Sequence, residues 1–102
     1  MRPGREKRLA SLIKRLTAEF LEREMVEELI LTVNRVALGA TGQRAKIYVT
    51  VFPDAAELTG ISQARRLRRP LQQFLQNHLK LKRVPYIDVT IDDEEKRKLN
   101  MA

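Results

Sequence analysis

The stretch Ala64–Phe74, ARRLRRPLQQF, decides how the second half of the chain folds, because a proline interrupts a helical pattern. Inside a helix, proline removes a hydrogen bond and clashes with the preceding turn, which costs about 3 kcal/mol or more. Neither penalty applies at the first helical position, and the residue before a proline avoids helical backbone angles. The sequence therefore predicts that one helix ends near Arg69 and a second begins at Pro70, with four arginines around the break.

Helical patterns lie on both sides of this break. The first runs over residues 55–67, with Asp54 as its expected N-cap. Gly60 weakens it, because glycine costs about 1 kcal/mol relative to alanine inside a helix. A kink at Arg69–Pro70 lets both apolar stripes face the same sheet. The expected stripe residues are Leu58, Ile61 and Ala64 in the first helix, then Leu71, Phe74, Leu75 and Leu79 in the second.

The remaining segments predict a helix and three strands. Apolar residues at helical spacing indicate an amphipathic helix over Arg5–Glu24. Alternating residues over 28–38 and 43–52, joined by a turn at Gly39–Gly42, indicate an antiparallel hairpin. A third strand is expected within 83–91. The inward residues are expected to be Leu29, Leu31 and Val33, then Ala45, Ile47, Val49 and Val51, then Ile87, Val89 and Ile91.

The order α-β-β-α-α-β predicts an α+β domain, with a three-stranded sheet and helices packed on one face. We expect residues 1–92 to form this single domain. Residues 93–102 are expected to be a charged C-terminal tail, either frayed or a short helix.

The positive charge is concentrated in one segment. The net charge of the chain is +7, and residues 58–87 contain seven basic residues and no acid. Outside that segment 13 basic residues balance 13 acidic ones. Such one-sided basicity is typical of a surface that binds a polyanion, although a solvated face is the plainer alternative.

The helix break adds a reason to expect phosphate at this surface. Free backbone N–H groups and the positive dipole end of the second helix favour an anion there. Four arginines around that terminus would form a phosphate site, whereas the alternative is a helix–helix corner with solvated arginines.

Catalysis is not expected, and neither is a cofactor or a metal. The chain has no cysteine, which excludes disulfides, thiolate catalysis and thiolate metal ligands. His78 is the only histidine and has no partner pattern, so we expect a partly buried surface residue. The acidic run Asp92–Glu95 is expected to be solvated rather than to bind a cation. We expect no signal peptide, and the sequence contains no apolar run of membrane-spanning length.

The predicted element order and the basic helix–break–helix resemble the type II KH arrangement. Within that class the chain resembles the ribosome-binding factor A family. The resemblance runs from Arg5 to Asp92 and is carried by LTVNRVALGATGQRAKIYVTVFPD (31–54), LKLKRVPYIDV (79–89) and FLEREM (20–25). GATG (39–42) has the form of the GxxG loop with which KH domains clamp a nucleic-acid backbone. Here it joins two strands rather than two helices, so we interpret it as a turn.

The chain differs from the family's usual pattern in three places. It lacks an Asp-Pro turn after the first helix, and its tail is short. The family's Ala-x-Gly kink corresponds here to Leu67, Arg68 and Arg69, followed by Pro70.

The resemblance implies a cytoplasmic, non-enzymatic assembly factor that binds rRNA of the immature 30S subunit and promotes its late maturation and rRNA processing. We expect a chain that is monomeric when free and does not bind membranes. Because few aromatics are present, we expect recognition of RNA shape and backbone rather than base stacking. The alternatives are a generic KH-like RNA- or DNA-binding module and a basic protein-interaction domain.

The residues expected to contact RNA fall into two tiers. The first tier is Arg65, Arg66, Arg68, Arg69, Lys80, Lys82 and Arg83, and the second tier is Arg35, Arg44, Lys46, Arg5 and Arg8.

Overall fold

Three strands form one sheet in the order β1-β2-β3, and helices precede, connect and follow them. The structure is a computed structural model that describes residues 3–25 and 28–101. Its elements are α1 (Pro3–Glu24), β1 (Ile30–Leu38), β2 (Arg44–Phe52), a short 3-10 helix η1 (Asp54–Ala56), α2 (Glu57–Arg66), α3 (Arg68–His78), β3 (Tyr86–Ile91) and α4 (Asp93–Asn100).

The first two strands form the predicted antiparallel hairpin, and β3 adds to β2 in parallel. The GATG segment is the turn between β1 and β2, as predicted. Its Gly42 N–H donates to the Gly39 carbonyl at 2.9 Å, and the Gly39 N–H donates to the Arg44 carbonyl at 2.8 Å. Gly42 has a φ of 71°, a backbone angle that glycine adopts without steric cost.

A β-bulge in β1 changes which residues face the core. Val33 pairs with Val49, but Arg35 pairs with Tyr48, so Asn34 is an extra residue. The inward positions therefore shift from odd to even numbers, which places Val36 opposite Ile47 on the core side. This shift is visible in the sequence, where apolar residues at 29, 31 and 33 are followed by apolar residues at 36 and 38.

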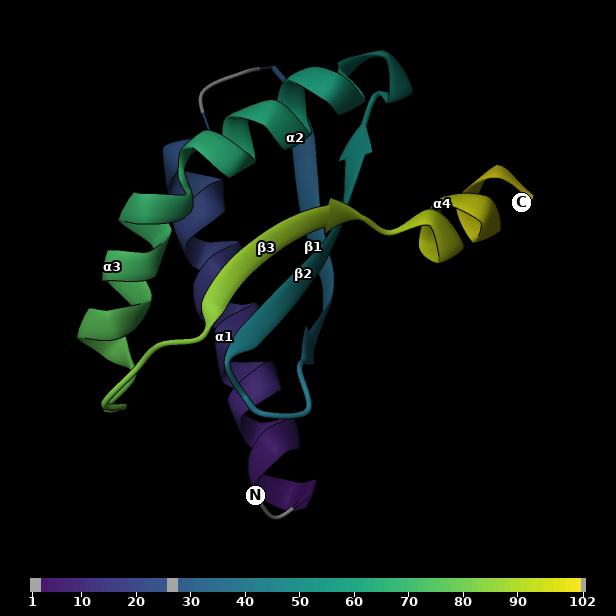
Figure 1. Cartoon of the computed structure of the whole chain (residues 1–102). Coiled ribbons are helices and arrows are strands. Elements are labelled where there is room, and N and C mark those ends of the chain that lie inside the picture. Colours follow the sequence, from purple (N-terminus) through teal and green to yellow (C-terminus); the bar gives the residue numbers. More distant parts are fainter. Residues whose placement is uncertain (1–2, 26–27, 102) are drawn as a thin grey trace.

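The core fills the space between one face of the sheet and the helices α1, α2 and α3. Figure 1 shows α1 running behind the sheet, and the α2–α3 pair curving along the side of β3. The predicted inward residues of β2 and β3 are buried, apart from Ile91, which is half-buried. The helices contribute Ile13, Leu16, Phe20 and Leu21 from α1, Ile61 and Ala64 from α2, and Leu71 and Leu75 from α3, and Leu79 adds to the core just after α3. The predicted α+β architecture is confirmed.

The break between the helices lies at Leu67, two residues before the position that the sequence predicts. Leu67 has φ −84° and ψ 5° and caps both α2 and α3. Pro70 is thus the third residue of α3, not the first, and Arg69 lies inside the helix. The proline is tolerated because the first turn of a helix has no intrahelical partners for its N–H groups. The first residue after it, Leu71, donates to the Leu67 carbonyl at 2.9 Å.

Two further predictions about α2 are wrong. Asp54 does not cap it, because Asp54–Ala56 form the separate helix η1 and the N-cap is Ala56, without a side-chain hydrogen bond. Leu58 is not part of the buried stripe and is 81% exposed. Since Glu57 begins α2, the buried stripe starts one turn later, at Gly60 and Ile61.

The acidic run after β3 begins the helix α4 rather than lying in solvent throughout. Asp92 is buried, accepts a hydrogen bond from the Glu95 N–H at 3.1 Å and caps this helix. Lys96 lies 3.0 Å from Glu57, and this hydrogen bond raises the pKa of Lys96 above its ordinary value. Residues 93–100 are therefore helical, the second of the two states expected for them. The division into residues 1–92 and 93–102 stays a prediction, and residues 1, 2, 26, 27 and 102 lie outside the described part.

Gly60 is required by close packing between α2 and β2. A Cβ at this position would lie 2.9 Å from Val51 Cγ1 and 3.0 Å from Val51 Cγ2. Valine is β-branched, which restricts its χ1 angle, so it cannot readily move aside. Gly60 has an unfavourable helix propensity, but its lack of a side chain permits the close approach of α2 to the sheet.

We expect Gly60→Ala to lower the free energy of unfolding by about 1 kcal/mol. Overpacking costs about 1–3 kcal/mol, and the gain in helix propensity of about 1 kcal/mol offsets only part of it. Urea denaturation measures the change. In a Val51→Ala background the same substitution should be neutral or stabilising, because the clashing methyl groups are gone. A stabilising effect of Gly60→Ala in the native background would contradict this account.

Candidate nucleic-acid interface

The four arginines near the helix break do not share one role. Arg65 Nε donates to the Val89 carbonyl of β3 at 3.1 Å, and Arg66 lies 3.4 Å from the Ser62 hydroxyl on α2. The Arg68 guanidinium lies 4.7 Å from the centre of the Tyr86 ring. Arg69 is exposed on the first turn of α3. The predicted cluster is therefore divided between the edge of the sheet, the surface of α2 and the start of β3.

Arg65 serves the fold as well as the charge of the surface. The Tyr86 N–H donates to the carbonyl of Gln43, just before β2, and the Asp92 N–H donates to the carbonyl of Val49 in β2. Because alternate residues of β3 face β2, the N–H of Ile87 and the carbonyl of Val89 lie on the free edge of β3. Arg65 satisfies that carbonyl, and Gln72 Oε1 accepts from the Ile87 N–H at 3.3 Å. Side chains of α2 and α3 thus cover the edge of β3.

Two basic residues from different elements lie against the Tyr86 ring, and a third precedes it in the chain. Tyr86 begins β3 opposite Arg44 of β2, whose guanidinium lies 5.5 Å from the ring centre. Arg68 of α3 approaches the same ring, and Arg83 precedes it in the loop from α3. Arg44 belongs to the second predicted tier, while Arg68 and Arg83 belong to the first. The fold brings these two tiers together.

A hollow of about 630 Å³ lies at this place. It is lined by residues 41–43 of the β1–β2 turn, Arg68 and Gln72 of α3, and residues 83–86; we call it the Tyr86 hollow. None of the described residues that line it is acidic. The electrostatic field in the hollow therefore favours an anion.

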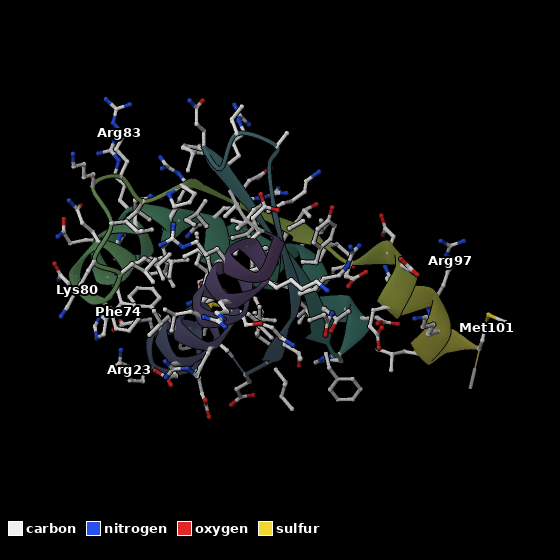
Figure 2. The ribbon with its side chains drawn as sticks, turned by 90° about the horizontal axis from the view of Figure 1, so that it is seen from below. Arg23, Phe74, Lys80, Arg83, Arg97 and Met101 are labelled. Carbon is white, nitrogen blue, oxygen red and sulfur yellow. The ribbon has the colours of Figure 1, made fainter. Side chains whose placement is uncertain are left out.

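The loop between α3 and β3 carries the other first-tier residues in exposed positions. Lys80, Lys82 and Arg83 are all exposed. In Figure 2 the labelled Lys80 and Arg83 side chains point away from the body of the molecule in different directions. Gln72 holds this loop against α3, since its Nε2 donates to the Pro85 carbonyl at 2.7 Å.

The second-tier residues lie on the uncovered face of the sheet and at the start of α1. Arg35 pairs with Tyr48 across β1 and β2, and its guanidinium lies 3.7 Å from the ring centre. Arg35 Nε also lies 3.5 Å from Asp92, so part of its charge is compensated. Lys46 and Arg44 are exposed on the same face. Arg5 and Arg8 are exposed at the N-terminal end of α1, which lies at the same end of the molecule as the β1–β2 turn in Figure 1.

Tyr86 and Gln72 are the residues that sequence reasoning missed. Tyr86 reads as the outward residue at the start of a strand, and Gln72 reads as part of a polar helix face. Only the fold shows that the aromatic ring lies among guanidinium groups and that the amide joins a loop to a helix.

The described residues hold neither a candidate metal cluster nor a buried histidine. Among residues 3–25 and 28–101 there is no group of three or more side chains suited to holding a metal ion. His78 is exposed rather than partly buried, and its Nδ1–H donates to the Phe74 carbonyl at 2.8 Å. No helix in the described ranges is both long and apolar enough to cross a membrane.

Comparison with known proteins identifies the family. The family model of ribosome-binding factor A matches residues 5–102. The chain belongs to the ribosome-binding factor A family. No curated protein sequence matches the chain at a significant level.

Solved structures of ribosome-binding factor A share the fold of this chain. The crystal structure of the factor from Thermus thermophilus is 25% identical, with a TM-score of 0.76 over 84% of this chain and 94% of that one. A homology model of the T. thermophilus factor, fitted into the cryo-EM map of a 30S–RbfA complex, is 26% identical, with a TM-score of 0.69 over 79% of this chain and 88% of that one. The solution structure of a Thermotoga maritima protein given the same family name is 25% identical, with a TM-score of 0.73 over 88% of this chain and 90% of that one. This likeness confirms the predicted fold class and the predicted family.

We expect Arg65→Met to lower the free energy of unfolding by about 1 kcal/mol, because the Val89 carbonyl loses its hydrogen-bond donor. Arg65→Gln should cost less than half as much, since the Gln amide nitrogen stands at the same distance along the side chain as Arg Nε. Urea denaturation of both variants, with Arg69→Met as the matched control, measures these differences. Equal losses for the Met variants at 65 and 69 would show that the contact with β3 contributes nothing.

Proposed function

We propose that this chain binds rRNA of the immature 30S subunit in the cytoplasm and promotes late maturation of the subunit, including rRNA processing. One observation carries the proposal furthest. In a member of the ribosome-binding factor A family, Arg68 and Arg83 line one hollow that has no acidic residue in its described lining, and Arg44 lies 5.5 Å from the centre of the Tyr86 ring.

Phosphate is the ligand that best suits this arrangement. Guanidinium groups bind phosphate oxygens with charge-assisted hydrogen bonds, and their planar shape allows two parallel bonds. Contacts of this kind position a protein on RNA and provide most of the binding free energy. Lys80 and Lys82, in the same loop as Arg83, and Arg69, in the first turn of α3, are exposed as well.

The likeness to the T. thermophilus factor supports the small subunit as the partner. That factor was fitted into the map of a 30S–RbfA complex. The present chain has the same fold and family, and we propose that it has the same class of partner.

We expect the chain to sediment with purified 30S subunits at low salt and to dissociate as salt rises. Each phosphate contact contributes about one unit to the slope of log K against log salt concentration. Arg68→Gln combined with Arg83→Gln should therefore reduce the slope by about two units.

Arg97→Gln combined with Lys98→Gln is the matched control, because it removes the same charge from α4. Arg97 lies at the opposite end of the molecule from Lys80 and Arg83 in Figure 2. A lack of association at low salt would refute the proposal. Equal binding to naked RNA strands of any sequence would instead indicate a generic nucleic-acid-binding module. A salt-insensitive complex that survives ribonuclease treatment would indicate an acidic protein partner.

Cells depleted of the chain should accumulate precursor rRNA of the small subunit, because maturation is delayed when an assembly factor is missing. Northern analysis of the precursor ends, with a complementing copy as the control, measures this effect. Normal precursor levels would show that the chain binds subunits without promoting their processing.

A further inference from the structure

Tyr86 presents an aromatic surface in the most basic part of the molecule. The residue is 47% exposed although it belongs to the sheet. Two guanidinium groups lie within 5.5 Å of its ring centre, one from Arg68 and one from Arg44. Arg44 is exposed and Arg68 is half-buried. Arginine side chains that rest on a ring in this way remain able to donate hydrogen bonds from their edges.

The backbone on both sides of Tyr86 is held in place. Its own N–H donates to the Gln43 carbonyl at 2.9 Å. The preceding Pro85 carbonyl accepts from Gln72 Nε2 at 2.7 Å, and the following Ile87 N–H donates to Gln72 Oε1 at 3.3 Å. The ring is therefore carried by a backbone that is already ordered, so little conformational entropy is lost when a ligand stacks on it.

The Tyr86 hollow has the size and the chemistry of a nucleotide site. Its volume of about 630 Å³ lies within the usual range of small-ligand pockets. It is lined by Tyr86, whose ring centre lies 4.7 Å from the Arg68 guanidinium, by Arg83, and by the polar residues Thr41 and Gln43. A nucleotide needs the same three elements, namely a stacking surface, cations for its phosphate, and polar groups for the edge of its base.

We propose that the Tyr86 hollow binds one unpaired nucleotide of RNA, with its base stacked on the Tyr86 ring and its phosphate at Arg68 and Arg83. This inference rests on the proposed function and names the form of RNA that the site takes. A base within a duplex already stacks on its neighbours and cannot lie on the ring.

Tyrosine emission provides a direct test. The chain has two tyrosines and no tryptophan, so Tyr86 is the only tyrosine in a Tyr48→Phe variant. A short RNA strand of mixed sequence should quench its emission as it binds, after correction for absorption by the RNA. The same strand annealed to its complement should bind at low salt with little quenching. Absence of quenching by the single strand would overturn the inference, as would equal quenching by the duplex.

Substitutions at position 86 test the contribution to affinity. Stacking of one base on one ring is worth roughly a 5- to 150-fold change in affinity. Tyr86→Leu should therefore weaken binding of the single strand by at least about fivefold, whereas Tyr86→Phe should keep nearly all of it. Equal affinities of the Leu and Phe variants would contradict a stacking role. If Tyr86→Leu does not fold, the emission titration of the Tyr48→Phe variant still tests whether a base stacks on Tyr86.

Two comparisons separate this inference from the proposed function. If the chain sediments with 30S subunits but the RNA strand leaves Tyr86 emission unchanged, only the nucleotide site is refuted. If the chain does not bind subunits at all, the proposed function fails whatever the emission shows. Quenching by a polyglutamate peptide equal to that by the RNA strand would assign the hollow to an acidic peptide instead.

Discussion

The parallel pairing of β2 with β3 is the constraint on which the rest of the structure depends. Parallel strands cannot be joined by a tight turn, so the chain must cross from one end of the sheet to the other. The helices α2 and α3 make this crossing, and the corner at Leu67 lets both of them pack on the same core. The crossing also determines the site. It brings Arg68 from the start of α3 to Tyr86 at the start of β3, beside the β1–β2 turn.

Hydrophobic patterns in the sequence predicted the elements well but not their junctions. The strands and the inward residues of β2 follow from simple alternation, and the structure confirms them. The proline could not locate the break, because every position in the first turn of a helix lacks an intrahelical partner and tolerates proline. Pro70 is therefore tolerated as the third residue of α3 as well as the first. The prediction that Asp54 caps α2 was wrong for a similar reason, since an acidic residue after Pro53 suits a 3-10 turn as well as a helix cap.

The charge of the candidate site was predictable, but the use of each side chain was not. Counting residues located the excess of basic charge in residues 58–87. The sequence could not show that Arg65 turns toward Val89 while Arg68 turns toward Tyr86, because these directions depend on where β3 lies relative to the helices. Tyr86 was not predicted as a site residue because one tyrosine in a strand is ordinary. Only its neighbours Arg44 and Arg68 distinguish it.

Arg65 and Gln72 also bear on how the chain behaves at high concentration. A strand at the edge of a sheet offers unpaired N–H and carbonyl groups to the edge of another molecule, which is a common start of aggregation. On β3 these groups are occupied by side chains of the crossing helices, at Val89 by Arg65 and at Ile87 by Gln72. An incoming strand would have to displace both bonds before it could pair. The connection that makes the parallel sheet possible thus also protects the β3 edge of the sheet.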